Sequence, residues 1–143
     1  MTTTAATLGQ TIPALPVRDV ARALEFYRDK LGFSVIHCDG GFAVLKRDGA
    51  EVHLWEASDE SWRGRTADDR PVRSGAESFI AGTASCRIAT EGIEDLYEEL
   101  KAHDVFHPVS RDGVRDTDFG TREFATLDPD GNLISFYEWR TET

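Results

Sequence analysis

The sequence is short of cysteine and of long apolar segments. Its 143 residues include only Cys38 and Cys86, and no apolar segment typical of a secretion signal follows the start. No stretch approaches the roughly 20 apolar residues that a membrane-spanning helix needs. A disulfide framework and a membrane anchor are therefore not expected. We expect a cytoplasmic protein whose two cysteines are free thiols, buried as small hydrophobic side chains.

Basic residues are also scarce. The chain has 16 Lys and Arg against 26 Asp and Glu, a formal net charge of −10. This charge repels polyanions, so we expect neither nucleic acid nor a membrane surface as a partner. The excess of carboxylates is compatible both with attraction of cationic ligands and with solubility alone. The chain also lacks a Gly-rich phosphate loop, a nucleophile elbow and a Cys-His signature, so nucleotide and covalent chemistry have no support.

The composition that is present is that of an ordinary globular protein, with 40% hydrophobic and 29% charged residues. The length suits one domain with its own core. We predict a single domain over residues 1–143, with a first module at about 10–57, a linker at about 58–82 and a second module at about 83–140.

The first module shows the pattern of one helix among four strands. Apolar residues recur at helical spacing between Asp19, which can cap a helix, and Gly32, which can end one: Val20, Ala23, Leu24, Tyr27 and Leu31. Strands are predicted at 11–17, 33–38, 42–46 and 51–56, the last two joined by a hairpin turn at 47–49. Pro13 and Pro16 suit an edge strand or a hinge.

The same pattern returns later in the chain. Three pairs of helix residues lie 73 positions apart, which indicates a structural duplication: Val20 and Ile93, Leu24 and Tyr97, Tyr27 and Leu100. Strands are predicted at 84–90, 123–127 and 133–139, with a turn at 128–132 and a further middle strand near 106–109. The predicted fold class is therefore α+β, with two βαβββ modules.

The linker at about 58–82 is rich in arginine and contains Trp62. Long ordered loops in compact domains often cover a site, whereas polar stretches of this kind are often only solvated connections. Both interpretations remain open.

A chain of this pattern that carries LPVRDVARALEFYRDKLGF and ends with FATLDPDGNLISFYEW resembles the vicinal oxygen chelate superfamily: glyoxalase I, extradiol dioxygenases and bleomycin resistance proteins. The segments IPALPVRDV, DGGFAVLKR and FGTREFATLDPDGN are most similar to the bleomycin-binding resistance proteins. The resemblance covers nearly the whole chain. It implies cupped mixed β-sheets, the glyoxalase/bleomycin resistance fold.

The superfamily's enzymes hold a divalent metal with His and Glu side chains from four strands. By motif register those positions fall here on Ile12, His53, Ser85 and Ser135, of which only His53 is a good metal ligand. The resemblance therefore implies no metal, no cofactor and no catalytic residue. Two alternatives stay open for His53: a half-buried histidine bonded to a neighbour, or an unconventional metal site with nearby carboxylates (Glu51, Glu56 and Glu138).

Without a metal, the cupped sheets imply a groove for a small organic ligand, with aromatic walls and a few polar groups. Alternation along 133–139 places Ser135 and Tyr137 on the groove side and Phe136 in the core. The candidate ligand-binding residues are Phe42, His53, Trp55, Trp62, Phe119, Tyr137, Ser135 and Asp39. Each aromatic side chain among them can equally serve ordinary core packing.

The resemblance also assigns roles within this set. Phe119 replaces a tryptophan that stacks the drug in bleomycin resistance proteins, and Phe42 matches another drug-contacting aromatic residue. Asp39 is placed to meet a cationic drug. The resemblance further implies a homodimer whose arms exchange at Pro13, with drug sites between the subunits.

The first hypothesis is a non-catalytic protein that sequesters a DNA-damaging antibiotic. The ligand would be bleomycin-like or another planar antibiotic, such as an anthraquinone-fused enediyne or a mitomycin. The alternatives are a metal-dependent lyase or dioxygenase of the same superfamily, and a sensor or binding partner, because a fold does not fix function.

Overall fold

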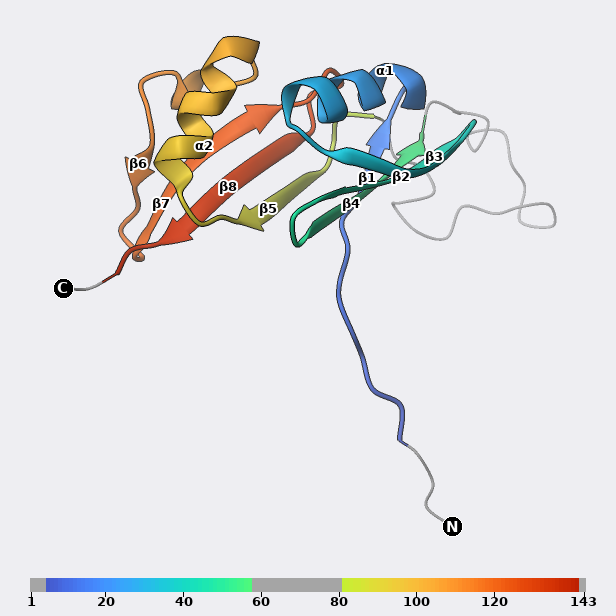
Figure 1. The fold of residues 1–143 in the computed structure, drawn as a ribbon, viewed down its shortest axis with the longest axis horizontal. Helices are drawn as coiled ribbons and strands as arrows, with labels where there is room; N and C mark the ends of the chain where they lie inside the picture. Colours follow the sequence, from blue (N-terminus) through green and yellow to red (C-terminus); the bar gives the residue numbers. More distant parts are fainter. Residues whose placement is uncertain (1–4, 58–80, 142–143) are drawn as a thin grey trace.

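The computed structural model describes residues 5–57 and 81–141, which form two four-stranded sheets (Figure 1). Sheet A has the spatial order β1-β4-β3-β2, with strands β1 (Ala14–Val17), β2 (Ser34–Asp39), β3 (Phe42–Arg47) and β4 (Ala50–Glu56). Sheet B repeats this order as β5-β8-β7-β6, with strands β5 (Ser85–Ala89), β6 (Arg115–Asp116), β7 (Thr121–Leu127) and β8 (Leu133–Trp139). The parallel pairs are β1 with β4 in sheet A and β5 with β8 in sheet B. All other neighbouring strands are antiparallel. The predicted pair of βαβββ modules is confirmed.

The helices form where the apolar spacing predicts them. In α1 (Val20–Glu25), Asp19 caps the first turn, accepting a hydrogen bond from the backbone N of Arg22 at 3.3 Å. The helix continues as one π-helical stretch (Phe26–Lys30) and stops at Gly32, whose φ is +79°. In the second module, α2 (Ile93–Leu100) continues into a 3₁₀ turn (Lys101–His103). No helix within the described ranges is long and apolar enough to cross a membrane.

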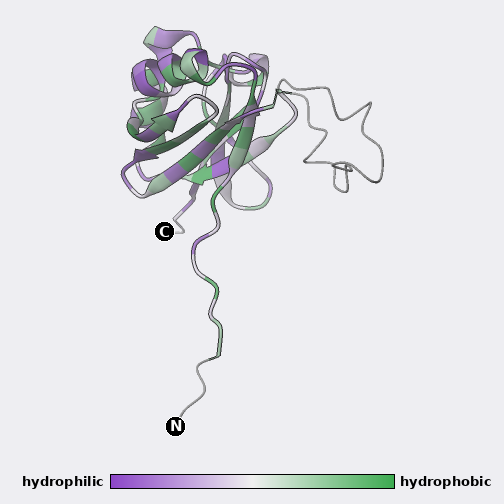
Figure 2. Cartoon of the chain, turned by 90° about the vertical axis from the view of Figure 1, so that its right-hand side faces the viewer, coloured by the Kyte–Doolittle hydropathy of each residue, from purple (hydrophilic) through white to green (hydrophobic). Residues whose placement is uncertain are grey.

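Both helices lie on the same side of the sheets (Figure 1). Their apolar residues belong to the same buried core as those of the strands. All three residue pairs of the repeat are buried: Val20 and Ile93, Leu24 and Tyr97, Tyr27 and Leu100. Hydrophobic and hydrophilic residues alternate along the strands (Figure 2), as expected for sheets buried on one face only. The core is continuous across both modules, from Leu15 and Leu54 in sheet A to Ile134 and Phe136 in sheet B.

The turn after β7 joins the two modules. Asp128 is only 5% exposed and accepts hydrogen bonds, each 2.9 Å long, from the Tyr27 hydroxyl and the Asn132 side chain, and from the backbone N of Asp130 and Asn132. Asn132 also donates to the carbonyl of Pro16 at 2.8 Å. Burial raises the pKa of the Tyr27 hydroxyl well above its usual value, and the nearby Asp128 raises it further. Tyr27 therefore stays a protonated donor.

A second link between the modules comes from the β3–β4 hairpin. The two-residue turn Asp48-Gly49, with a φ of +52° at Asp48, places Arg47 opposite α2. The guanidinium of Arg47 donates to both carboxylate oxygens of Glu99, at 2.8 and 2.9 Å, and to the carbonyl of Leu31 at 2.8 Å. The hairpin predicted at 47–49 is thus confirmed.

The middle strand predicted near 106–109 is wrong. Phe106 makes only an isolated bridge to Thr126, and Pro108–Ser110 forms a 3₁₀ turn. Pro108 has no N–H for a strand ladder, and the Nδ1 atom of His107 caps the turn by accepting from the N of Val109 at 3.1 Å. The corresponding strand, β6, comes later in the chain. Likewise β1 begins only after Pro13, rather than at residue 11.

The prediction of two buried cysteines is wrong for Cys38. It lies exposed on β2, the edge strand of sheet A, next to a register shift between Val35 and His37. Cys86 is partly buried, and burial raises the pKa of its thiol to about 11. Cys86 is therefore an inert, protonated thiol.

Candidate functional site

Each sheet has one face that the helices do not cover. Along β4, Val52 and Leu54 are buried, whereas the side chains between them stay partly exposed. We define the open face of sheet A as His37, Phe42, Val44, Glu51, His53 and Trp55. The open face of sheet B comprises Arg87, Thr121, Glu123, Ser135, Tyr137 and Trp139. The prediction that alternation puts Phe136 in the core is confirmed, since it is 5% exposed.

The open face of sheet A combines aromatic side chains with a polar pair on β4. The Phe42 ring contacts the His53 ring edge to face, with centroids 5.2 Å apart, and the strand register sets Phe42 opposite Trp55. The Nε2 atom of His53 lies 2.8 Å from a carboxylate oxygen of Glu51. The structure therefore brings Phe42, His53 and Trp55 together, and His53 is the half-buried histidine bonded to a neighbour that the sequence left open.

Asp39 lies at the end of β2, at the edge of this face. Its carboxylate accepts from the backbone N of Gly41 at 3.0 Å and lies 3.4 Å from Nε2 of His37. These hydrogen bonds, that from Gly41 first, hold the pKa of the Asp39 carboxyl below its usual value. Asp39 thus provides a fixed negative charge beside the aromatic residues.

The open face of sheet B is built around an arginine that the sequence reasoning did not select. Arg87 donates to both carboxylate oxygens of Glu123, at 2.9 and 2.5 Å, and its guanidinium carbon lies 4.7 Å from the centre of the Tyr137 ring. The hydrogen bond from Arg87 lowers the pKa of the Glu123 carboxyl. Strand alternation could have found Arg87, because it lies two residues after Ser85 on the same face.

The carboxylate of Glu123 has a further support. It accepts from the hydroxyl of Thr121 at 2.7 Å, and that hydroxyl lies 2.8 Å from the hydroxyl of Thr117. Thr121 is the fully buried member of this face, so this chain of hydrogen bonds fixes Glu123 from a site that solvent does not reach.

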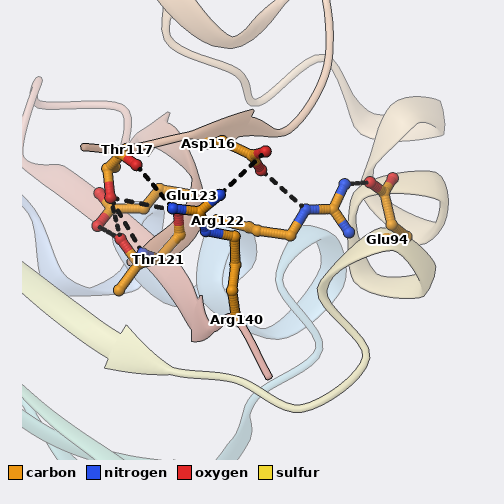
Figure 3. A network of polar contacts seen from close by, with 7 residues as sticks. All are labelled: Glu94, Asp116, Thr117, Thr121, Arg122, Glu123 and Arg140. Carbon is orange, nitrogen blue, oxygen red and sulfur yellow. Dashed lines mark hydrogen bonds and ion pairs between the residues drawn. The ribbon is translucent and has the colours of Figure 1, made fainter. Parts of the chain in front are cut away.

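The neighbouring arginine, Arg122, points to the opposite face of sheet B. Figure 3 shows it between the carboxylate of Asp116 and that of Glu94 on α2, pointing away from the Thr117, Thr121 and Glu123 group. Its Nε donates to Asp116 at 3.2 Å, and it also forms an ion pair with Glu94. Arg122 thus ties β6, β7 and α2 together and has no place on the open face.

Phe119 lies in the turn before β7, at the end of sheet B. It is 58% exposed, and the next residue, Gly120, has a φ of +96°. A Cβ at Gly120 would lie 3.9 Å from the Trp139 ring, so the turn passes close to an indole that is itself 63% exposed. Phe119 and Trp139 thus mark an exposed aromatic end of the sheet.

Two cavities adjoin these faces. One, of about 680 Å³, lies between the β3–β4 hairpin, the end of β5 and the start of α2, where Glu51 and Arg87 reach it. The other, of about 270 Å³, lies over sheet B and is lined by Glu123, Ser135 and Thr117. Neither cavity is lined by the predicted aromatic residues (Phe42, Trp55, Phe119 and Tyr137). Trp62 lies outside the described residues.

The residues present do not fit the metal of the superfamily's enzymes. By motif register, its four ligand positions fall on Ile12, His53, Ser85 and Ser135, and these residues offer a single strong donor. Across residues 5–57 and 81–141, no group of three or more His, Cys, Asp or Glu side chains is arranged to hold a metal ion. Glu51 adds one carboxylate beside His53, which makes a pair and not a coordination shell.

Comparison with known proteins gives one consistent picture. The family model described as Glyoxalase/Bleomycin resistance protein/Dioxygenase superfamily matches residues 7–136. The chain is 54% identical over 129 residues to proteins named "Bleomycin resistance protein" from Geobacillus stearothermophilus and Staphylococcus aureus. The match covers 90% of this chain and 96% of each relative.

Solved structures share the fold. A glyoxalase/bleomycin resistance protein/dioxygenase from Nocardioides is 22% identical, with a TM-score of 0.68 over 98% of this chain and 89% of that one. The bleomycin-binding protein of bleomycin-producing Streptomyces verticillus, complexed with copper(II)-bleomycin, is also 22% identical, with a TM-score of 0.68 over 96% and 100%. At this identity the likeness establishes the fold alone.

Proposed function

The chain belongs to the glyoxalase/bleomycin resistance protein/dioxygenase superfamily, and from this premise we propose that it binds a bleomycin-type antibiotic and sequesters it in the cytoplasm without catalysing a reaction. The observation that carries the proposal is the 54% identity to curated bleomycin resistance proteins over nearly their whole length. The match extends over 90% of this chain and 96% of each relative, so it includes the sequence of both modules.

The chemistry of the open faces supports a binding role. Aromatic side chains and a few polar groups are the usual walls of a site for a planar organic molecule. Phe42 and Trp55 supply such walls on sheet A, and Asp39 adds a negative charge that suits a cationic drug. Sequestration needs only affinity, so it is compatible with the weak donor set around His53.

We extend the proposal to a homodimer in which the open face of sheet A in one protomer faces the open face of sheet B in its partner. In one chain both faces lie open, and Phe119 and Trp139 are largely exposed. Exposed aromatic clusters of this kind are typical of binding or subunit surfaces. The segment before Pro13 runs away from sheet A (Figure 1), with Leu8 99% exposed, which supports arm exchange at Pro13.

Titration with drug tests the proposed function. We expect saturable binding of about one bleomycin per chain, from metal-free and copper-loaded drug alike, unchanged by a chelator and with the drug recovered intact. Calorimetry and quenching of tryptophan emission measure the binding, and mass spectrometry checks the drug. A mitomycin and an anthraquinone-fused enediyne serve as competing ligands. Conversion of a substrate that stops on chelation would instead support the metal-dependent lyase or dioxygenase.

Removal of the N-terminal segment tests the dimer. Light scattering of the full chain should give twice the 15.9 kDa chain mass. In a variant that lacks residues 1–11, the dissociation constant of the dimer should be about 100-fold higher or more than in the full chain. The reason is that exchanged arms contribute to both halves of the interface. The variant should also lose drug binding. The control lacks only residues 2–4 and should stay dimeric. A full-length monomer that binds drug would contradict the intersubunit groove.

A further inference from the structure

Resting on the proposed drug-binding function, we infer that Arg87 is the group on the open face of sheet B that determines which ligand binds. The guanidinium is a planar platform that stacks against a flat conjugated group and donates hydrogen bonds to that group's neutral acceptors, such as carboxamide and carbonyl oxygens. Strand alternation predicts Tyr137 as a ligand-binding residue. In the structure its ring lies against the guanidinium and supports it.

The position of Arg87 is fixed before any ligand arrives. Its two terminal nitrogens are engaged by Glu123, and its guanidinium lies over the Tyr137 ring. Glu123 is in turn fixed by Thr121. A long side chain that is already ordered loses little conformational entropy on binding, so its contacts contribute more fully to affinity.

The guanidinium still has free binding capacity. An arginine has five N–H donors, and the two hydrogen bonds to Glu123 use two of them. Within residues 5–57 and 81–141, the other three N–H groups have no hydrogen-bond partner. The Arg87 side chain is 47% exposed and that of Glu123 is 18% exposed, so a ligand on this face meets the guanidinium first.

The charge balance selects the class of ligand. The carboxylate of Glu123 neutralises the guanidinium at close range, and the whole chain carries a net charge of −10. An anionic ligand gains little from such a pair, whereas a neutral acceptor still gains a hydrogen bond from each free N–H. The arrangement therefore favours flat, neutral, carboxamide-bearing groups over phosphates or carboxylates.

The location of Arg87 agrees with this role. It lines the larger cavity, while its partner Glu123 lines the smaller cavity together with Ser135. The strand register sets Arg87 directly beside Ser135. A flat group lying on the guanidinium thus also reaches a hydroxyl that can donate to or accept from it.

A pair of matched arginine variants tests the inference. Arg87→Lys keeps the charge but loses the planar fork, and we expect bleomycin to bind about 10-fold more weakly or worse by calorimetry. The control is Arg122→Lys, because Arg122 is also paired with carboxylates, those of Glu94 and Asp116, but on the helix side of the same sheet. It should bind drug within about twofold of the unsubstituted chain. Equal affinity of Arg87→Lys and the unsubstituted chain would overturn the inference.

A second measurement uses the unsubstituted chain, so it does not depend on whether an Arg87 variant folds. In the ¹⁵N-labelled full chain, the Nε–H resonance of Arg87 should shift when bleomycin is added, whereas that of Arg122 should stay. Two unshifted resonances in a chain that binds the drug would refute the role of Arg87 and leave the proposed function intact. Absence of binding by the unsubstituted chain would refute the proposed function and, with it, this inference.

Discussion

Asp128→Ala should lower the free energy of unfolding by about 3–4 kcal/mol, a large share of the roughly 5–15 kcal/mol that stabilises a domain. The carboxylate is buried and accepts four hydrogen bonds, three of them fully buried: those from Tyr27, the Asn132 backbone and the Asn132 side chain. Alanine leaves all of these donors without their acceptor at the junction of the two modules. Urea unfolding measures the change.

Comparing the unfolding free energies of related variants shows whether the lost hydrogen bonds cause the destabilisation. Tyr27→Phe removes one donor and leaves the carboxylate bonded, so we expect a loss of only about 1 kcal/mol. Asp128→Asn keeps one carbonyl oxygen but turns an amide toward the Asn132 side chain, so its loss should lie between those of Tyr27→Phe and Asp128→Ala. Asp130→Ala is the matched control in the same turn: among the described residues its side chain accepts a single hydrogen bond, from the N of Arg18 at 3.3 Å, and the change should stay below about 0.5 kcal/mol.

Equal losses of unfolding free energy in Asp128→Ala and Asp130→Ala would show that the turn stays folded without the buried carboxylate as an acceptor. The apolar core, the Arg47–Glu99 pair and the hydrogen bond from Asn132 to the Pro16 carbonyl would then be enough to hold the modules together. A large loss confined to Asp128 would instead identify this carboxylate as the group that fixes one module relative to the other, and hence fixes the relative position of the two open faces.

Much of the fold could be predicted because its signals are local. Asp19 and Gly32 mark the ends of the first helix through capping and a left-handed backbone, and the duplicated apolar spacing gives both modules. The second module's middle strand could not be found, because Phe106 looks like a strand residue until Pro108 interrupts the ladder. The strand that replaces it, β6, has only two residues and no hydrophobic pattern to detect.

The site was predictable in composition and less so in arrangement. Alternation separates Tyr137 from Phe136 correctly, because it needs only one strand. It cannot reveal that Arg87 covers the Tyr137 ring, since that depends on the pairing of β5, β8 and β7. The exposure of Cys38 was missed for a similar reason: it depends on β2 being an edge strand.

Trp55→Ala should weaken bleomycin binding by about 10- to 100-fold, because an indole contributes the largest flat apolar surface on the open face of sheet A. Trp55 is only partly buried and lies opposite Phe42, so its loss should change stability far less than affinity. Trp55→Phe keeps a stacking ring and should lose only a few-fold. Calorimetry is the measurement, since tryptophan emission itself changes in these variants. Ile36→Ala, a more exposed apolar residue on β2, is the control and should bind normally.

Mixing Trp55→Ala with Arg87→Lys then separates the two possible locations of the groove. If each groove joins sheet A of one protomer to sheet B of its partner, a mixed dimer has one groove with both substitutions and one with neither. After exchange of subunits, about one site in four should recover the unsubstituted affinity, as random pairing requires. If both sheets of one chain form the groove, every site keeps a substitution and mixing restores nothing. Recovery of tight binding in the mixture would therefore place the drug between subunits, and its absence would place it within one chain.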